Sequence, residues 1–187
     1  MINLADNKFC MLDIEDEALE LMITNDGTNV LEISKNKNVM LVFLRHFGCQ
    51  FCRETIDELS TLRNEIETKK TEIIFVHMGD NATAQLYFER FKINNVRHIS
   101  DPTCNFYAKF GLIKGSFTQL FGLQSWYRGF TLQAKYGAET NKSLGDSFQM
   151  PGVFMIQNGK IVESFIHKIV SDKPDYLKLV AYCDIQR

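Results

Sequence analysis

Runs of apolar residues along the chain predict the strands of one sheet. Val39–Leu44 is apolar throughout, which is typical of a strand buried on both faces. Near the start, the turn signal Asn25-Asp26-Gly27 predicts a β-hairpin, and near the end Asn158-Gly159 predicts another. The other expected strands are Leu21–Thr24 and Asn29–Ile33 in the first hairpin, Glu72–Met78, Val96–Ser100, and Gly152–Ile156 and Ile161–Ile166 in the second hairpin.

Apolar residues at helical spacing predict helices between these strands. A stripe of Ile56, Leu59, Leu62 and Ile66 belongs to a helix that follows Gly48 and ends near Lys70. A second expected helix carries Ala84, Tyr87, Phe88 and Phe91. A third begins at the N-cap Asp101, followed by Pro102, and ends at Gly111. A fourth begins at Asp172 and carries Tyr176, Leu177, Leu179 and Val180.

The segment 112–149 is rich in aromatic residues and has no clear period. We expect one or two helices or a long loop that packs against the sheet, with a cover over a substrate pocket as the alternative. Within it, Arg128 could meet an oxyanion or a peroxide, although an exposed arginine is the simpler reading.

The order of elements predicts an α/β fold with a central mixed sheet flanked by helices. Strands separated by helices favour parallel pairing, and the late hairpin adds antiparallel strands. A βαβ half followed by a ββα half is the thioredoxin-like arrangement, here with an N-terminal hairpin and a helical insertion before the last β-hairpin. We expect residues 1–187 to form a single domain, with 1–20 as a peripheral arm.

Composition and charge narrow the function classes. The net charge of −2 gives no reason to expect nucleic acid or an anionic membrane as a partner. The acidic N-terminus argues against a signal peptide or presequence, and no window is apolar enough to span a bilayer. Five cysteines, scattered apart from one pair, argue against a disulfide-stapled secreted domain and favour the cytoplasm.

The close pair, Cys49-Gln50-Phe51-Cys52, is the main candidate for chemistry. Cys49 follows a buried strand and starts a helix, where free N–H groups and the helix dipole stabilise a thiolate. Cys52 lies one turn on, so the two sulfurs can form a disulfide. We expect Cys49 to attack and Cys52 to resolve the product.

The residues around the pair qualify this prediction. Arg45, His46 and Arg53 would lower the thiol pKa, whereas the acidic residues Glu54, Asp57 and Glu58 would raise it. His46 could stabilise the thiolate, shuttle a proton, or simply face solvent. The alternatives to redox chemistry are a zinc half-site and two incidental buried cysteines, but no second ligand pair accompanies the first.

Met150-Pro151 precedes the last hairpin, which is where a thioredoxin-like fold places a cis proline facing the cysteine pair. We therefore expect a cis bond, with a trans proline at the start of an edge strand as the alternative. The remaining cysteines Cys10, Cys104 and Cys183 are expected to be ordinary thiols, His77 and His98 to be structural, and His167 to be a surface residue.

The segment Val42–Glu54 resembles the active-site segment of peroxiredoxin-like proteins in the alkyl hydroperoxide reductase/thiol-specific antioxidant (AhpC/TSA) superfamily. Supporting matches are Asp101-Pro102, Tyr107, Gly111-Leu112, Pro151–Phe154, the Asn-Gly hairpin and Ser171–Asp175. The resemblance implies a thioredoxin-like fold, an antioxidant role and electrons from a thioredoxin- or glutathione-type reductant. Val42 and His46 stand where true peroxiredoxins carry Pro and Thr, and Phe43 stands where thioredoxins often carry a buried acid.

Three functions remain open from the sequence. The first is a peroxiredoxin-like reduction of hydroperoxides through a sulfenic acid resolved to an intramolecular disulfide. The second is a thiol-disulfide oxidoreductase acting on protein or small-molecule disulfides, and the third is a non-catalytic binding module. We expect an oxidoreductase whose redox-active center needs no cofactor and no metal, and a homodimer is compatible with the sequence.

Overall fold

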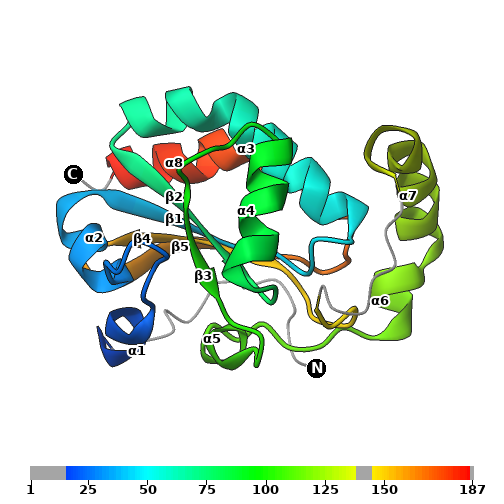
Figure 1. Ribbon diagram of the computed structural model, residues 1–187, viewed down its shortest axis with the longest axis horizontal. Helices are drawn as coiled ribbons and strands as arrows, with labels where there is room; N and C mark the ends of the chain where they lie inside the picture. The colour runs from blue at the N-terminus through cyan, green and yellow to red at the C-terminus, as the bar shows by residue number, and fades with distance from the viewer. Residues whose placement is uncertain (1–15, 138–144, 186–187) are drawn as a thin grey trace, which may run out of the picture.

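The computed structural model describes residues 16–137 and 145–185. Its centre is a mixed sheet of five strands in the order β3-β2-β1-β4-β5 (Figure 1). β1 pairs in parallel with β2, and β2 with β3, whereas β4 and β5 are antiparallel. The strands are β1 (Asn38–Phe43), β2 (Thr71–His77), β3 (Arg97–Ser100), β4 (Gly152–Gln157) and β5 (Lys160–Ile166).

Helices cover both faces of the sheet and bury two apolar layers against it (Figure 1). This confirms the predicted α/β, thioredoxin-like arrangement, and β1 is buried on both faces as its apolar run predicted. One face carries α3 (Gln50–Thr68), α4 (Asn81–Arg90) and α8 (Tyr176–Ile185), and the other carries α1 (Asp16–Leu21), α2 (Val30–Asn36) and α5 (Asn105–Lys109).

The predicted N-terminal hairpin is wrong in both strands: Leu21 ends α1, and the second segment forms a helix. Asn29 caps a helix instead, because its Oδ1 accepts a hydrogen bond from the N–H of Glu32 at 2.7 Å. The expected turn does form, with Gly27 at φ 88°, but only the isolated bridge between Ile23 and Asn29 follows it. Helix α2 then buries its apolar residues against the sheet.

Part of the predicted arm is packed. Ala18 and Leu19 of α1 are buried in the layer beneath the sheet. Residues 1–15, including Cys10, lie outside the described residues.

The helix expected at Asp101-Pro102 begins later, at Asn105. The Asp101 carboxylate still caps it, since it accepts hydrogen bonds from the N–H groups of Asn105 at 3.0 Å and Phe106 at 2.7 Å. Cys104, the residue before the helix, adopts a left-handed backbone conformation with φ 57°. Gly111, at φ 70°, ends it as predicted.

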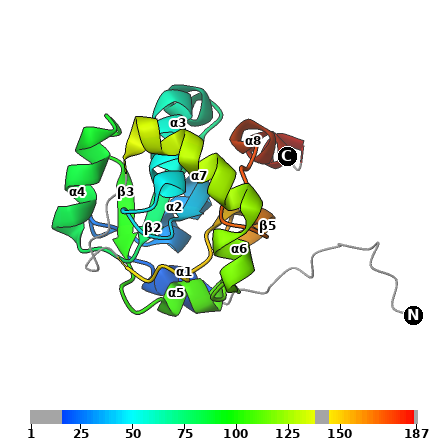
Figure 2. The same cartoon turned by 90° about the vertical axis from the view of Figure 1, so that its right-hand side faces the viewer.

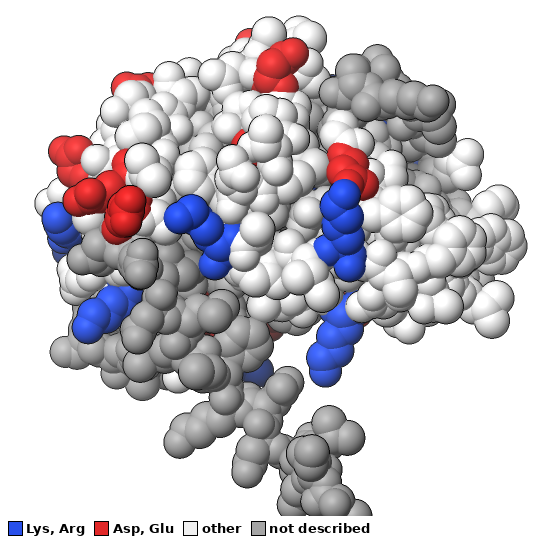
Figure 3. Space-filling model, turned by 90° about the horizontal axis from the view of Figure 1, so that it is seen from below, with Lys and Arg blue, Asp and Glu red and all other residues white. Residues whose placement is uncertain are grey.

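The aromatic segment forms two helices, α6 (Phe117–Phe121) and α7 (Leu123–Tyr136), at one end of the molecule (Figure 2). The expectation that they pack against the sheet is wrong for most of their rings. On the face seen from below, this end of the molecule shows almost no charged side chains (Figure 3). Its exposed apolar residues are Phe117, Phe121, Leu123, Trp126, Tyr127 and Phe130.

The second hairpin is confirmed, with Asn158 at φ 50° and Gly159 at φ 77° in its turn. The predicted cis bond before Pro151 is wrong, because no described peptide bond is cis. Gln149, just before this bond, forms an isolated β-bridge with Lys114, and β4 begins at Gly152. A trans Met150-Pro151 bond joins these two extended segments. No helix in the described ranges 16–137 and 145–185 is long and apolar enough to cross a membrane.

Candidate active site

The cysteine pair lies at the carboxyl end of β1, on the first turn of α3. Cys49 is the N-cap residue, with extended φ and ψ of −77° and 125°, and the helix continues from Gln50. Cys52 faces the core together with Ile56 and Leu59, as the helical spacing predicted. Both thiols are free and nearly buried, with Cys49 6% and Cys52 5% exposed.

Arg45 holds both sulfurs. Its guanidinium Nη1 donates a hydrogen bond to Cys49 Sγ at 3.3 Å, and its backbone N–H donates to Cys52 Sγ at 3.2 Å. The other side of the guanidinium grips the carbonyl oxygen of Ser147, from Nε at 2.8 Å and Nη2 at 2.5 Å. These two hydrogen bonds, a fork on one carbonyl oxygen, fix the Arg45 cation beside Cys49. The site is buried, so the cation attracts a thiolate more strongly there than it would in water.

The two thiols have opposite acidities. The hydrogen bond from the Cys52 thiol, with the charges of Arg45 and His46, lowers the pKa of Cys49 well below its usual value. Burial, together with the neighbouring Cys49, raises the pKa of Cys52 well above its usual value. The geometry therefore favours a thiolate at Cys49 and a protonated thiol at Cys52.

The predicted supporting residues His46 and Arg53 lie in different settings. His46 is partly buried beside Cys49, and burial lowers the pKa of its imidazole while the Cys49 charge opposes that shift. Arg53 is fully buried and turned away, with Nε donating to the Phe47 carbonyl at 2.8 Å and Nη1 to the Tyr136 carbonyl at 2.6 Å. It ties the loop before the cysteines to the end of α7.

Met150 and Pro151 are both buried near the pair. Met150 shares the apolar layer that contains Cys49 and Cys52, and Pro151 lines a cavity with Cys52. The structure thus brings Pro151 to the predicted place, although with a trans bond.

Cys49 opens onto a cavity of about 380 Å³. Its floor carries Arg45, His46 and Gln50, and the α6–α7 helices form an aromatic wall. The aromatic segment therefore lies beside Cys49, and its role as a cover over a substrate stays a prediction. The wall residues that line the cavity are Leu120, Phe121, Trp126 and Phe130, joined by Phe51 from α3.

Two residues near the cavity have features that the sequence did not predict. The Gln50 amide oxygen is buried without a hydrogen-bond partner in the described part of the chain, and Gln50 lines the cavity. Arg128 is not a free surface cation, because Nη2 binds Glu54 at 2.6 Å and the guanidinium lies 5.6 Å from the centre of the Phe51 ring. A contact across 74 residues leaves no signal in local spacing.

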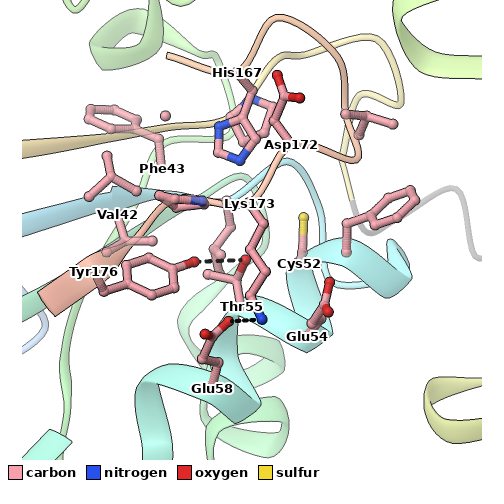
Figure 4. A pocket seen from close by; sticks show the side chains of 17 residues that line it. Val42, Phe43, Cys52, Glu54, Thr55, Glu58, His167, Asp172, Lys173 and Tyr176 are labelled. Carbon is pink, nitrogen blue, oxygen red and sulfur yellow. Dashed lines mark hydrogen bonds and ion pairs between the residues drawn. The ribbon is translucent and has the colours of Figure 1, made fainter. Parts of the chain in front are cut away.

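Cys52 opens onto a different and much smaller cavity, of about 20 Å³, between α3 and the segment that follows β5 (Figure 4). His167 lines it, so the prediction of a surface histidine is wrong: it is only 8% exposed. His167 follows the last strand, and its neighbours in the sequence show no pattern that predicts burial. Figure 4 also shows Tyr176 bonded to Thr55 and Lys173 paired with Glu58 at the cavity edge.

The other candidate residues are spread through the fold. His77 and His98 are buried and share a hydrogen bond of 2.9 Å, as expected of structural histidines. Cys104 contacts Met78, and Cys183 is buried in the core. Among the described residues, no group of three or more His, Cys, Asp or Glu side chains could hold a metal ion.

Comparison with known proteins identifies the family. The family model for AhpC/TSA antioxidant enzymes matches residues 58–169, more than half of the chain. This chain belongs to the AhpC/TSA family. The AhpC/TSA assignment makes it a thiol-dependent oxidoreductase of the peroxiredoxin-like kind, as the resemblance of its active-site segment implied. Since the matched region begins after Cys52, the roles of the two cysteines rest on the geometry described above.

Relatives of this AhpC/TSA protein agree on the fold. The prostamide/prostaglandin F synthase of Salmo salar is 26% identical over 84% of this chain and 78% of its own. Peroxiredoxin 6 of Arenicola marina, solved as a cysteine mutant, superposes with a TM-score of 0.63 at 13% identity over 87% of this chain and 68% of its own. Peroxiredoxin Q of Xanthomonas campestris superposes with a TM-score of 0.60 at 15% identity, over 98% of this chain and 100% of its own.

Proposed function

We propose that the protein is a thiol peroxidase in which Cys49 attacks a hydroperoxide and Cys52 resolves the product. The observation that carries this proposal is the position of the Cys49 sulfur, which Arg45 and Cys52 flank at the floor of an open cavity. A low thiol pKa, a neighbouring cation and access for a small substrate are what such a nucleophile needs.

The proposed cycle balances in three steps. The Cys49 thiolate attacks the outer oxygen of the hydroperoxide, the O–O bond breaks, and the leaving alkoxide takes a proton, so that a sulfenic acid and an alcohol result. The Cys52 thiol then attacks the Cys49 sulfur, and a disulfide and water form. Two thiols of an external reductant finally reduce the disulfide and become a disulfide themselves.

The aromatic wall supports an apolar organic hydroperoxide as the substrate, because phenyl and indole groups offer apolar surface to an alkyl chain. The peroxide's polar end would lie between Arg45 and Gln50. We propose that the Gln50 amide oxygen, which is buried without a partner among the described residues, accepts a hydrogen bond from the peroxide O–H.

The second candidate is a thiol-disulfide oxidoreductase, and the pairing of an acidic Cys49 with a protonated Cys52 favours it equally well. The presence of Val42 and His46, where peroxiredoxins carry Pro and Thr, favours it, whereas membership of the AhpC/TSA family favours the peroxidase. A thioredoxin- or glutathione-type reductant, a cytoplasmic location and a homodimer remain part of the proposal.

The test is a paired assay on one preparation. Consumption of an organic hydroperoxide with a dithiol reductant is measured beside reduction of a model protein disulfide. We expect peroxide consumption, with Cys49 and Cys52 found linked by mass spectrometry after one turnover. Reduction of the model disulfide alone would replace the peroxidase with the oxidoreductase, and activity in neither assay would favour the non-catalytic binding module.

A further inference from the structure

The proposed cycle does not say which group takes the proton from the Cys52 thiol. Cys52 is buried, its pKa is raised well above the usual value, and yet its thiol must lose a proton to attack Cys49. Val42 and Phe43 line the cavity and cannot accept a proton. The carboxylates that also line it are bound already: Glu54 to Arg128, Glu58 to Lys173, and Asp172 to two backbone N–H groups.

His167 is the side chain on this cavity with a free buried acceptor. Its Nδ1 is buried and has no hydrogen-bond partner in the part of the chain that the structure describes. Burial also lowers the pKa of its imidazole to about 4, so that the ring is neutral and holds a lone pair at neutral pH. A buried polar nitrogen without a partner is costly, and such atoms often have a functional role.

The cavity that both residues line is large enough for one water molecule. The cavity measures about 20 Å³, and a polar site needs roughly 10–15 Å³ to hold a water. Cys52 and His167 both line it, one from α3 and one from the segment after β5 (Figure 4). The charged groups that face it are Glu54 and Glu58 on α3 and Asp172 and Lys173 before α8.

We propose that His167 is a positioning and proton-accepting residue for Cys52, acting through one water in this cavity. This inference rests on the proposed resolving role of Cys52. Once Cys49 is a sulfenic acid, its sulfur no longer carries the negative charge that holds the Cys52 proton, and the S–H group can turn towards the cavity.

The proton balance is closed. Cys52 gives its proton through the water to His167 as its sulfur attacks Cys49, and the S–O bond breaks. The leaving hydroxide takes a proton from solvent in the Cys49 cavity and becomes water. His167 then releases its proton to solvent, so the condensation as a whole neither consumes nor releases protons.

The test separates the two chemical steps in His167→Gln. The protein is mixed with one equivalent of hydroperoxide, sulfenic acid is trapped with dimedone at timed intervals, and sulfenic acid and disulfide are counted by mass spectrometry. We expect an unchanged rate of oxidation at Cys49 and a resolving rate lower by about 10²-fold, the range of general acid–base effects. Thr55→Val, which removes another polar group from the same cavity, should resolve at the wild-type rate.

The pH profile distinguishes proton transfer from packing. Between pH 6 and 8 the wild-type resolving rate should stay level, because His167 is neutral throughout. In His167→Gln the rate should rise with pH, since Cys52 must then ionise without the imidazole. A level profile in the variant, or an equal fall in both steps, would overturn the inference.

Failure of the peroxidase is recognised separately. If the wild-type protein forms no sulfenic acid, the peroxidase proposal is lost, and the same variants are compared in the release of a mixed disulfide from Cys49 by Cys52. That release needs the same deprotonation. A wild-type release rate in His167→Gln would then contradict the inference, and a rate lower by about 10²-fold would support it.

Discussion

Replacement of Arg45 by methionine should raise the pKa of the Cys49 thiol more than any other change of a charged residue near the site. Arg45→Met keeps an unbranched apolar stem, but removes the cation that lies 3.3 Å from Cys49 Sγ. It also removes the fork on the Ser147 carbonyl. The thiolate then loses its closest positive charge.

The size of the effect follows from the distance and the burial. Two unit charges about 4 Å apart attract by about 4 kcal/mol at an effective dielectric constant of about 20. Water in the Cys49 cavity and the hydrogen bond from Cys52 replace part of this interaction. We therefore expect a loss of about 1.4–2.8 kcal/mol, which is a rise of about 1–2 pKa units.

The assay is the pH dependence of alkylation at Cys49 by iodoacetamide, read by tandem mass spectrometry. Arg45→Lys keeps the charge but not the fork, and should raise the pKa less than Arg45→Met. Lys135→Met removes an exposed cation that pairs with Asp57, and should leave the profile unchanged. If Arg45→Met leaves the pKa of Cys49 unchanged, the electrostatic argument is refuted. If both Arg45 variants raise this pKa equally, the effect comes from the lost hydrogen bonds to the Ser147 carbonyl and not from the charge.

Three further outcomes are expected. Cys52→Ser should react once with peroxide and then stall as a sulfenic acid at Cys49, visible by dimedone labelling; continued turnover would exclude Cys52 as the resolver. Tyr107→Phe removes a buried hydroxyl that donates to two main-chain carbonyls, and should lower the free energy of unfolding in urea by about 1–3 kcal/mol without changing the Cys49 pKa. Burial lowers the pKa of His77 to about 3 and also lowers that of His98. Stability should therefore be full above the unfolded value of about 6.5 and fall as the pH drops below it, a trend that replacement of both histidines by glutamine should weaken.

Local signals were sufficient where a short segment determines its own structure. The apolar run of β1, the Asn158-Gly159 turn and the stripe on α3 each predicted the observed element. The lower pKa of Cys49 relative to Cys52 has the expected direction, and Arg45 was expected among the cations that cause it. The hydrogen bond from the Cys52 thiol, which contributes most to lowering the pKa of Cys49, was not predicted.

Where long-range packing decided the outcome, the sequence misled. Val30–Ile33 has the β-branched and apolar character of a strand, yet the cap at Asn29 starts a helix there, and that helix buries its apolar residues. The rings of α7 were expected inside because they are apolar, but they stand exposed beside the cavity. His167 became buried only because the segment after β5 folds back over α3 (Figure 4).

The two sulfurs open onto separate cavities, and this has a practical consequence for chemical labelling. An electrophile with a bulky aromatic tail fits the space of about 380 Å³ at Cys49 and not the space of about 20 Å³ at Cys52. Such a reagent should modify Cys49 alone and leave Cys52 unmodified in the same peptide. A covalent probe of this design would report the reduced fraction of the protein in a cell extract, since oxidation of Cys49 removes the thiolate that it labels.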